Sequence, residues 1–369
     1  MTQHFLLSAA LRDFSLKDIL DMSEDDAMMF FAEHRWKSRD HQVCPQCGLI
    51  DNHYFRTKRR QWKCKSCEHC FSVTSGMVFD GHRLPYKLLL TALLLFTSAA
   101  QGMSALQMSR LLGIQAKSAA TFEGKLKEVL VKQANRPLLK GIIHVDGGHF
   151  GGKPRRARRR RKITPEEVMA RINQKGSAKR KRYQGCSQLN LKKKANKRVT
   201  YVLRELDAEG KKAVKTIVCV GKTENERDAL AFIHRYVEKG STIMSDENPA
   251  YSKLNTLGYT HMAVQHSIEY CRDDGVNENQ AESFFSRLRR MEYGTTHRIT
   301  PTYLMDYSQE MAWREDTRTM TTLEKITELL KMCNKNGLSE WWRGYWQGNR
   351  RGDEILLNDL LKIEDSLRT

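Results

Sequence analysis

Three acidic residues in the second half of the chain have positions that would suit metal-dependent chemistry on phosphodiesters. Asp146 ends the apolar run "GIIHVD", Asp246 ends "STIMSD", and Glu282 lies in the amphipathic run "NENQAESFFSRLRR". If one sheet edge and a flanking helix bring these carboxylates together, their charges repel unless cations bind. Two Mg²⁺ ions about 3.5–4 Å apart would neutralise them and prepare in-line attack on a phosphodiester. Alternatively, each of these residues is an ordinary surface acid. This explanation suits Glu282, but it suits Asp146 poorly because Asp146 ends an apolar run.

A cysteine module precedes these acids. Cys44, Cys47, Cys64 and Cys67 form two C-x2-C pairs with sixteen residues between them, and four thiolates satisfy tetrahedral zinc. The sequence between the pairs alternates as a hairpin would. Cys70 continues the run and could replace Cys67, whereas His53 and His69 are less natural ligands. We therefore expect a structural zinc site that supports folding and DNA docking, not catalysis.

The positive charge of the chain is concentrated in one segment. The formal net charge is +20, and residues 153–198 hold 19 Lys and Arg against two Glu. This concentration favours a polyanion partner such as nucleic acid, although a solvated, disordered loop is the plainer alternative. The basic residues that come first after Asp146 are Lys153, Arg155, Arg156, Arg158, Arg159, Arg160, Arg161 and Lys162.

Hydrophobic periodicity predicts helices first and strands later. Residues 1–40 and about 84–135 show helical spacing, whereas strands are expected at 141–146, 199–206, 213–220 and 241–246. A helix between the last two strands opens with Thr223 and Glu226 in capping-box spacing. A short strand at "HMAVQ" and the Glu282 helix follow. This order predicts an α/β fold with a mixed sheet and flanking helices.

The segment "MSALQMSRLLGIQAKSAATFEGKLKEVL" reads as a helix capped by Ser104, a turn at Gly113 and a second helix from about Ser118. This layout fits a helix-turn-helix or an ordinary helical hairpin equally well. Its place between a zinc module and a basic segment favours the DNA-binding interpretation.

We expect five regions along the chain. They are an N-terminal helical region (1–40), a zinc ribbon (41–80), helix-turn-helix-like DNA-binding helices (81–138), a catalytic domain (139–320) with the basic insertion 153–198, and a C-terminal helical tail (321–369). In that tail, the aromatic and arginine residues of "SEWWRGYWQGNRR" could stack on DNA bases, or form a small core or subunit contact.

Several of these segments together resemble the DDE transposases of bacterial insertion sequences, in the ISXO-like group with an N-terminal zinc ribbon and an RNase H-like catalytic domain. The runs "VDGGHFGGK", "SDENPAY" and "NENQAESFFSRLRRMEYGTTHRI" resemble the three catalytic blocks of that group. The run "CPQCG…WKCKSCEHCFSVTSGMVF" resembles its zinc ribbon, and "MSALQMSRLLGI" its connecting helices. The similar blocks extend from about residue 40 to 316.

The resemblance assigns roles to individual residues. Asp146, Asp246 and Glu282 become the metal-binding triad, Asn279 lines the site, and Arg289 falls where a basic residue contacts DNA. His266, Gly294 and His297 match recurring positions without a clear role. Two residues depart from the family pattern, namely Gly147, where Glu is frequent, and Cys70, where a basic residue is commoner. The length of the arginine-rich insertion is a third departure.

The resemblance implies a transposase that binds the terminal inverted repeats of its element, cleaves the ends and joins the 3′-OH to target DNA. It implies structural Zn²⁺, two catalytic Mg²⁺ or Mn²⁺ ions, double-stranded DNA as partner, and a homo-oligomer, as a dimer in a synaptic complex. Two alternatives are a catalytically silent DNA-binding regulator and a metal-dependent nuclease.

The N-terminus lacks the pattern of a secretory signal and the longest apolar run is too short to span a bilayer, so we expect a cytoplasmic, nucleoid-associated protein without a membrane partner.

Overall fold

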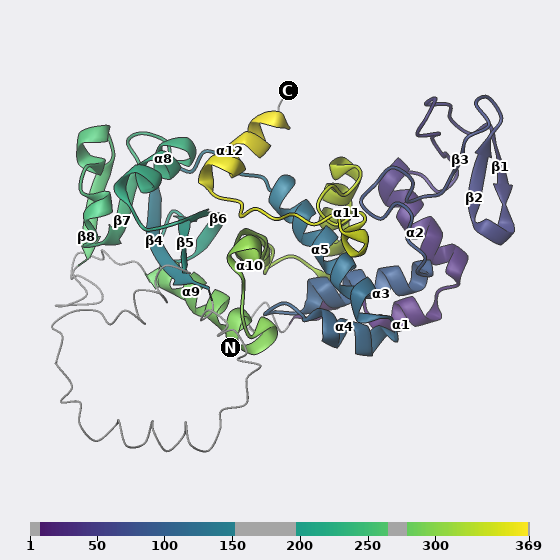
Figure 1. The fold of residues 1–369 in the computed structure, drawn as a ribbon, viewed down its shortest axis with the longest axis horizontal. Coiled ribbons are helices and arrows are strands. Elements are labelled where there is room, and N and C mark those ends of the chain that lie inside the picture. Colours follow the sequence, from purple (N-terminus) through teal and green to yellow (C-terminus); the bar gives the residue numbers. More distant parts are fainter. Residues whose placement is uncertain (1–7, 152–196, 265–278, 368–369) are drawn as a thin grey trace, which may run out of the picture.

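The computed structural model describes residues 8–151, 197–264 and 279–367. The molecule is elongated, with a small ribbon and a group of helices toward one end and a five-stranded sheet toward the other (Figure 1). Each part has its own hydrophobic core. Helices and a mixed sheet therefore confirm the expected α/β class.

The N-terminal part combines helices with a small antiparallel sheet. The apolar sequence of α3 places Leu89, Leu90 and Leu93 in the core, with less than 2% of each residue exposed, because a helix that is apolar on most sides must be buried on most sides. The two helices before α3 in the chain, the next helix after it and a helix near the C-terminus contact it. The elements are a 3-10 turn (Ala9–Arg12), α1 (Leu16–Asp21), α2 (Glu24–Trp36), β1 (His53–Arg56), a 3-10 turn (Thr57–Arg59), β2 (Gln61–Cys64), β3 (Cys70–Phe71), α3 (Tyr86–Ser98), α4 (Ala105–Leu112) and α5 (Ala116–Lys132).

The second part of the chain is built on a sheet with the order β6-β5-β4-β7-β8. The strands are β4 (Ile142–Phe150), β5 (Arg198–Leu206), β6 (Ala213–Gly221), β7 (Thr242–Asp246) and β8 (Thr260–Val264). The first three pair antiparallel in chain order, and β7 and β8 then extend the sheet in parallel on the other side of β4. This is the mixed arrangement expected for an RNase H-like domain, and it confirms that prediction.

Helices cover the sheet and continue to the C-terminus. The long apolar surfaces of β5 and β6 are covered by α10, and α9 packs on β4. The bounds are α8 (Glu226–Tyr236), 3-10 turns (Pro249–Tyr251, Leu254–Leu257), α9 (Asn279–Arg290), a π-helix (Met291–Thr296), a 3-10 turn (Pro301–Tyr303), α10 (Leu304–Asp316), α11 (Thr322–Asn336), a 3-10 turn (Tyr345–Gln347) and α12 (Leu357–Ser366).

Two local expectations differ from the structure. Strand β4 does not end at Asp146 but continues to Phe150, because β5 pairs with it as far as Phe150 and Arg198. The helix cap also differs, since the side chain of Asn225, not Thr223, accepts the backbone N–H of Asp228 at 2.9 Å. Asn is a strong N-cap residue, and the capping-box spacing of Thr223 and Glu226 was therefore misleading.

The C-terminal segment contributes to both cores. Leu329 and Leu330 of α11 belong to the helical core, and Leu360 of α12 belongs to the core of the sheet. Between them, Trp342 packs so closely on α5 that a methyl group at Gly124 would lie 2.1 Å from its ring. The aromatic and arginine-rich segment thus forms a packing contact within the chain.

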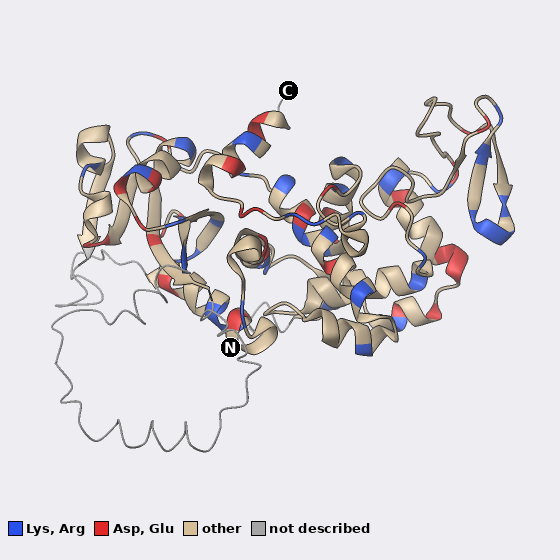
Figure 2. Cartoon of the chain, in the orientation of Figure 1, with Lys and Arg blue, Asp and Glu red and all other residues tan. Residues whose placement is uncertain are grey.

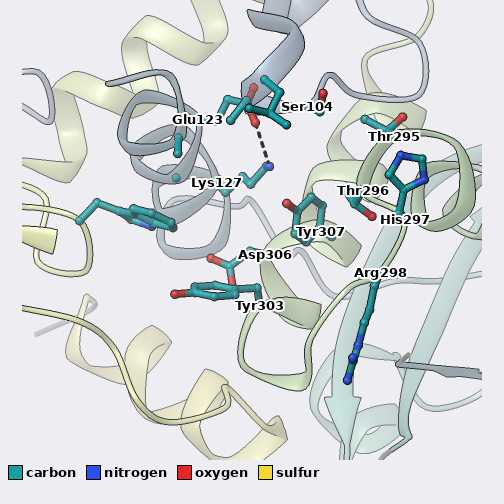
Figure 3. A pocket seen from close by; sticks show the side chains of 15 residues that line it. Ser104, Glu123, Lys127, Thr295, Thr296, His297, Arg298, Tyr303, Asp306 and Tyr307 are labelled. Carbon is teal, nitrogen blue, oxygen red and sulfur yellow. Dashed lines mark hydrogen bonds and ion pairs between the residues drawn. The ribbon is translucent and has the colours of Figure 1, made fainter. Parts of the chain in front are cut away.

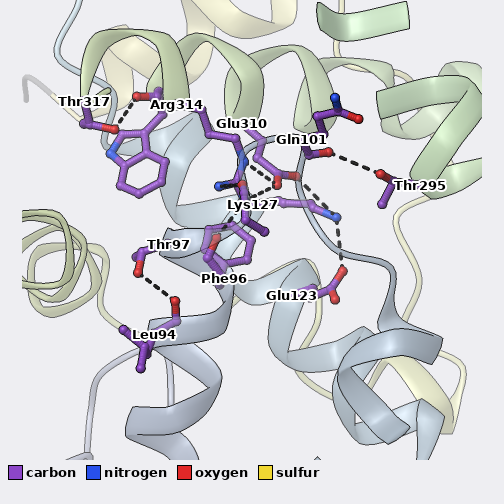
Figure 4. A network of polar contacts seen from close by, with 12 residues as sticks. Leu94, Phe96, Thr97, Gln101, Glu123, Lys127, Thr295, Glu310, Arg314 and Thr317 are labelled. Carbon is purple, nitrogen blue, oxygen red and sulfur yellow. Dashed lines mark hydrogen bonds and ion pairs between the residues drawn. The ribbon is translucent and has the colours of Figure 1, made fainter. Parts of the chain in front are cut away.

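A buried ionic network joins the two parts (Figure 4). Arg314 of α10 donates to the carbonyl oxygen of Phe96 at 2.8 Å and pairs with Glu310 at 2.7 Å. Lys127 of α5 lies 3.5 Å from Glu310 and 3.4 Å from Glu123. Because these charged side chains are almost completely buried, each depends on its partners to offset the cost of desolvation.

None of the helices that the structure describes has the length and apolar character needed to cross a bilayer.

Candidate zinc and catalytic sites

The four cysteines of the ribbon come together in space. Their Sγ atoms all lie within 4.8 Å of one another, and the distances from Cys44 to Cys67 and from Cys47 to Cys64 are both 3.6 Å. A disulfide would require about 2.05 Å, whereas Zn–S bonds of about 2.3 Å in a tetrahedron separate sulfurs by about 3.8 Å. The arrangement therefore fits a structural zinc ion and excludes disulfides among these cysteines.

The other residues considered as zinc ligands have different positions. Cys70 lies in β3 opposite Lys63 and contacts a guanidinium nitrogen of Arg56 at 3.4 Å. His53 Nε2 lies 3.0 Å from the carbonyl oxygen of Gln42. Neither Cys70 nor His53, nor His69, belongs to the group of four. The structure thus favours Cys67 over Cys70 as the fourth ligand.

The hairpin of the ribbon ends in a basic tip. Arg56, Lys58 and Arg59 are exposed at the turn between β1 and β2, and Arg60 follows them. Figure 2 shows this band of positive charge at the far end of the ribbon. Individual basic residues of the hairpin were not singled out in the sequence, because a short charged turn is common on any protein surface.

The register of two parallel strands places Asp146 and Asp246 next to each other. In that register His144 lies opposite Met244, and the pairing of β4 with β7 ends there. Two residues further along, Asp146 and Asp246 occupy equivalent positions, where neighbouring strands are about 4.8 Å apart. Both carboxylates therefore lie at the carboxyl edge of β7, beside the point where the two strands stop pairing.

Helix α9 brings Glu282 to the same region. Asp146 and Gly148 point to one face of β4, since side chains alternate along a strand. On that face, a methyl group at Gly148 would lie 2.6 Å from the ring of Phe285. Glu282 precedes Phe285 by one helical turn, and its charge acts on Asp146. Gly148 thus permits the close approach of α9 that positions Glu282.

The electrostatics of Asp146 reflect this convergence. Burial and then the carboxylate of Asp246 raise the pKa of Asp146 to about 7, with smaller contributions from Glu224 and Glu282. The backbone N–H of Gly147 donates to Asp146 Oδ1 at 2.6 Å and opposes the increase. A site that concentrates negative charge in this way favours divalent cations.

Glu224 is a fourth acidic residue at this site, and it was not predicted from the sequence. It lies in the loop between β6 and α8, and only 14% of its side chain is exposed. A residue in a polar loop such as "GKTENERD" carries no periodic signal. Only the folded arrangement places its charge beside Asp146.

The remaining candidates surround the acids or lie elsewhere. Asn279 is the first residue of α9 and is exposed. Arg289 is exposed near the end of the same helix, with its guanidinium 5.7 Å from the ring centroid of Phe150. It thus lies beside the end of β4, where the basic insertion begins. The basic residues expected to bind DNA lie outside the described residues, as does His266; they are Lys153, Arg155, Arg156, Arg158, Arg159, Arg160, Arg161 and Lys162.

The two helices predicted as a helix-turn-helix are present. The side chain of Ser104 caps α4 by accepting the backbone N–H of Gln107. Gly113 adopts a left-handed conformation at φ +63°, and α5 follows at Ala116. Most of α5 is buried, and its exposed residues are at its N-terminal end. This is the end that contacts bases in helix-turn-helix proteins.

A pocket of about 360 Å³ lies between α4, α5, α10 and the segment after α9 (Figure 3). Its lining includes Lys127, Tyr307 and His297, one of the residues without a clear role. It contains none of the acidic triad. The pocket therefore belongs to the junction between the two parts of the molecule and not to the acidic site.

Comparison with protein families gives two matches. Residues 138–316 match the ISXO2-like transposase domain, and residues 22–70 match the transposase zinc-ribbon domain. Together the two matched segments cover more than half of the chain. No curated protein matches the chain.

Proposed function

Because this chain belongs to the IS1595-family DDE transposases with an N-terminal zinc ribbon, we propose that it binds the terminal inverted repeats of an insertion sequence, cleaves the element ends and joins them to target DNA. The observation that carries this proposal is the equivalent placement of Asp146 and Asp246 on two parallel strands, with Glu282 approaching on α9. All three residues belong to the matched transposase domain. Its work on DNA would place the protein in the cytoplasm, at the nucleoid.

The acidic residues have the ligand chemistry of catalytic Mg²⁺ or Mn²⁺, although among the described residues only the four cysteines share a common metal-ligand distance. Every acidic side chain at the site offers carboxylate oxygens, the ligands that these hard cations prefer. Oε1 of Glu224 is buried and has no hydrogen-bond partner among the described residues. When bound, two such ions would neutralise the carboxylates and activate the attacking oxygen for in-line displacement at phosphorus.

The residues of the chain would divide the remaining work. Asp146, Asp246 and Glu282 would hold the ions, and Asn279 would line the site at the start of α9. Cleavage would free a 3′-OH at the element end, and this oxygen would attack a phosphodiester of target DNA while the target's own 3′ oxygen leaves. In this transesterification no bond to the protein forms.

DNA binding would use separate surfaces. The basic tip of the zinc ribbon, the exposed N-terminal end of α5, Arg289 and the arginine-rich insertion would contact the duplex. Lys and Arg contacts to phosphates supply affinity and fix the orientation of the duplex. Since two ends must be joined in one event, we propose a dimer or larger assembly in the synaptic complex.

A joining assay tests this proposal. Zinc-bound protein, labelled inverted-repeat DNA, a plasmid target and Mg²⁺ would be compared for the wild type, Glu282→Gln and Glu209→Gln. Glu209 is a matched control because it is exposed in the turn between β5 and β6, where it pairs with Lys211.

We expect joined product from the wild type and Glu209→Gln, and none from Glu282→Gln. Cleavage without joining would support a nuclease instead. Binding of the ends with neither cleavage nor joining in Mg²⁺ or Mn²⁺ would support a regulator.

A further inference from the structure

We propose that Glu224 is a fourth carboxylate of the catalytic metal site, and that the nearby hydroxyl group of Tyr251 donates to one of the site's carboxylates when a cation binds. This inference rests on the proposed function, since it requires a cation held by Asp146 and Asp246. Glu224 would reach the site from the face of the sheet opposite to Glu282. The evidence is the close approach of Glu224 to β4, its unpartnered oxygen, and the surroundings of Tyr251.

The approach of Glu224 depends on a missing side chain in β4. Gly147 points to the face opposite to Asp146, and a methyl group there would lie only 2.6 Å from Glu224 Oε1 and 2.9 Å from its Cδ. A side chain at this position would therefore occupy the place of the Glu224 carboxylate. With glycine, that carboxylate lies against the backbone of the residue next to Asp146.

The contacts of Glu224 leave one of its oxygens unused. Oε2 lies 3.6 Å from Nε2 of His149, whose side chain is 53% exposed. Oε1 is buried and accepts no hydrogen bond within the described part of the chain. A buried carboxylate oxygen without a partner is costly. A single, long contact with an exposed histidine does not account for it, whereas coordination of a cation would.

Tyr251 is a second, independent sign of a ligand at this place. The residue is completely buried, yet its hydroxyl group has no hydrogen-bond partner among the residues described. Burial and the carboxylates of Glu224, Asp146 and Asp246 raise the pKa of this hydroxyl well above its usual value. The hydroxyl group thus faces the acidic cluster as a neutral donor that could orient one of these carboxylates.

The site would then be enclosed from both faces of the sheet. Glu282 approaches on α9 from the face of Asp146, and Glu224 approaches from the face of Gly147. Tyr251 lies in the 3-10 turn that packs on α8. A fourth carboxylate increases the charge attraction for divalent cations. It would also hold a cation when DNA is not bound to the protein.

Direct measurement of Mn²⁺ affinity tests this inference without relying on activity. Electron paramagnetic resonance would follow free aqueous Mn²⁺ in titrations of the full-length, zinc-bound protein. The variants are Glu224→Gln, Tyr251→Phe, Asp146→Asn and Glu226→Gln. Glu226→Gln is the matched control, because Glu226 is on the same loop-helix junction but its side chain is 40% exposed and pairs with Lys253 at 2.7 Å.

We expect Glu224→Gln to weaken Mn²⁺ binding about tenfold or more, and Tyr251→Phe to weaken it less, as partners that orient metal ligands do. Glu226→Gln should leave the affinity unchanged within about twofold. If Glu224→Gln binds Mn²⁺ like the control while Asp146→Asn does not, Glu224 has no role and the proposed function stands. If Asp146→Asn also binds like the control, the proposed metal site itself is wrong.

Gly147→Ala gives a second test that leaves the Glu224 residue in place. The added methyl group meets the flexible end of Glu224, which can move aside without unfolding the strand. We expect Gly147→Ala to weaken Mn²⁺ binding in the wild type but to add nothing in Glu224→Gln, because coupled residues are not additive. Equal weakening in both backgrounds would place the effect on Asp146 and overturn the role of Glu224.

Discussion

At the scale of single residues, the proposed metal ligand Asp146 also affects the stability of the protein. Burial and neighbouring carboxylates raise its pKa from 3.8 to about 7, so the native state keeps its proton at pH values where the unfolded chain has lost it. Stability therefore falls as the pH rises between these two values, because the native state binds more protons than the unfolded state. Cations that bind the ionised form would offset this loss.

Asp146→Asn should remove this pH dependence. Between pH 5 and pH 8 in Mg²⁺-free buffer, we expect the wild type to lose on the order of 2 kcal/mol of unfolding free energy that the variant keeps. Thermal unfolding of both proteins across this range measures the difference, and saturating Mg²⁺ should reduce it. Parallel losses in both proteins would show that Asp146 ionises normally.

The sequence could identify some site residues and not others for a physical reason. Asp146 and Asp246 each follow an apolar run, so both the strand and its polar end are visible in the pattern. Glu224 lies in a loop and Tyr251 in a short 3-10 turn, which carry no periodic signal, and only the folded chain places them near Asp146. Gly147 seemed a plain departure from the family, whereas in the structure it leaves room for Glu224.

At the scale of elements, the contact of α9 with β4 determines where Glu282 lies relative to Asp146. We predict that Gly148→Ala destabilises the protein by about 1–3 kcal/mol, because the new methyl group would meet the buried rings of Phe285 and Phe150 at 2.6 and 2.9 Å. Chemical denaturation measures this loss. Gly352→Ala is the control, since nothing lies within 4 Å of a methyl group there. Equal stability of both variants would show that α9 can shift at no cost.

The zinc ribbon permits a test at the same scale. Cys44→Ser should lose the bound zinc, unfold the ribbon and abolish binding to the element ends, while the sheet stays folded around its own core. Cys70→Ser should keep one zinc ion per chain, since Cys70 lies outside the group of four. Elemental analysis and a DNA-binding assay measure both results, and zinc retained by Cys44→Ser would contradict the ligand set.

The sequence predicted which helices and strands form better than it predicted where they end and what they pack against. The cysteine spacing and the alternation between the pairs predicted the ribbon and its hairpin, and glycine and serine indicated the boundaries of α4. The extension of β4 past Asp146 was missed because two glycines resemble a turn, whereas pairing with β5 keeps them in the strand. The burial of α5 depends on α10 and on Trp342, which are distant in the sequence.

At the scale of the whole molecule, the proposed function requires the two cores to act together, because DNA bound at the ribbon would be cut at the sheet. The buried network of Arg314, Glu310 and Lys127 lies between them, and the C-terminal segment contributes a helix to each core. Arg314 also donates to the carbonyl oxygens of Phe96 and Ala99 at the end of α3. Removal of this guanidinium leaves Glu310 and two carbonyl groups with fewer partners.

We therefore predict that Arg314→Met costs about 3–5 kcal/mol, as the loss of one partner from a buried ionic network does, and that it uncouples the two cores. Differential scanning calorimetry should show one cooperative transition for the wild type and two for the variant, of which only the first moves when zinc is removed. Lys211→Met is the control, because the pair of Lys211 with Glu209 is exposed and contributes little. If Arg314→Met instead shows a single transition at lower temperature, the C-terminal segment alone couples the two cores. The ribbon and the sheet would then keep their relative positions without the network.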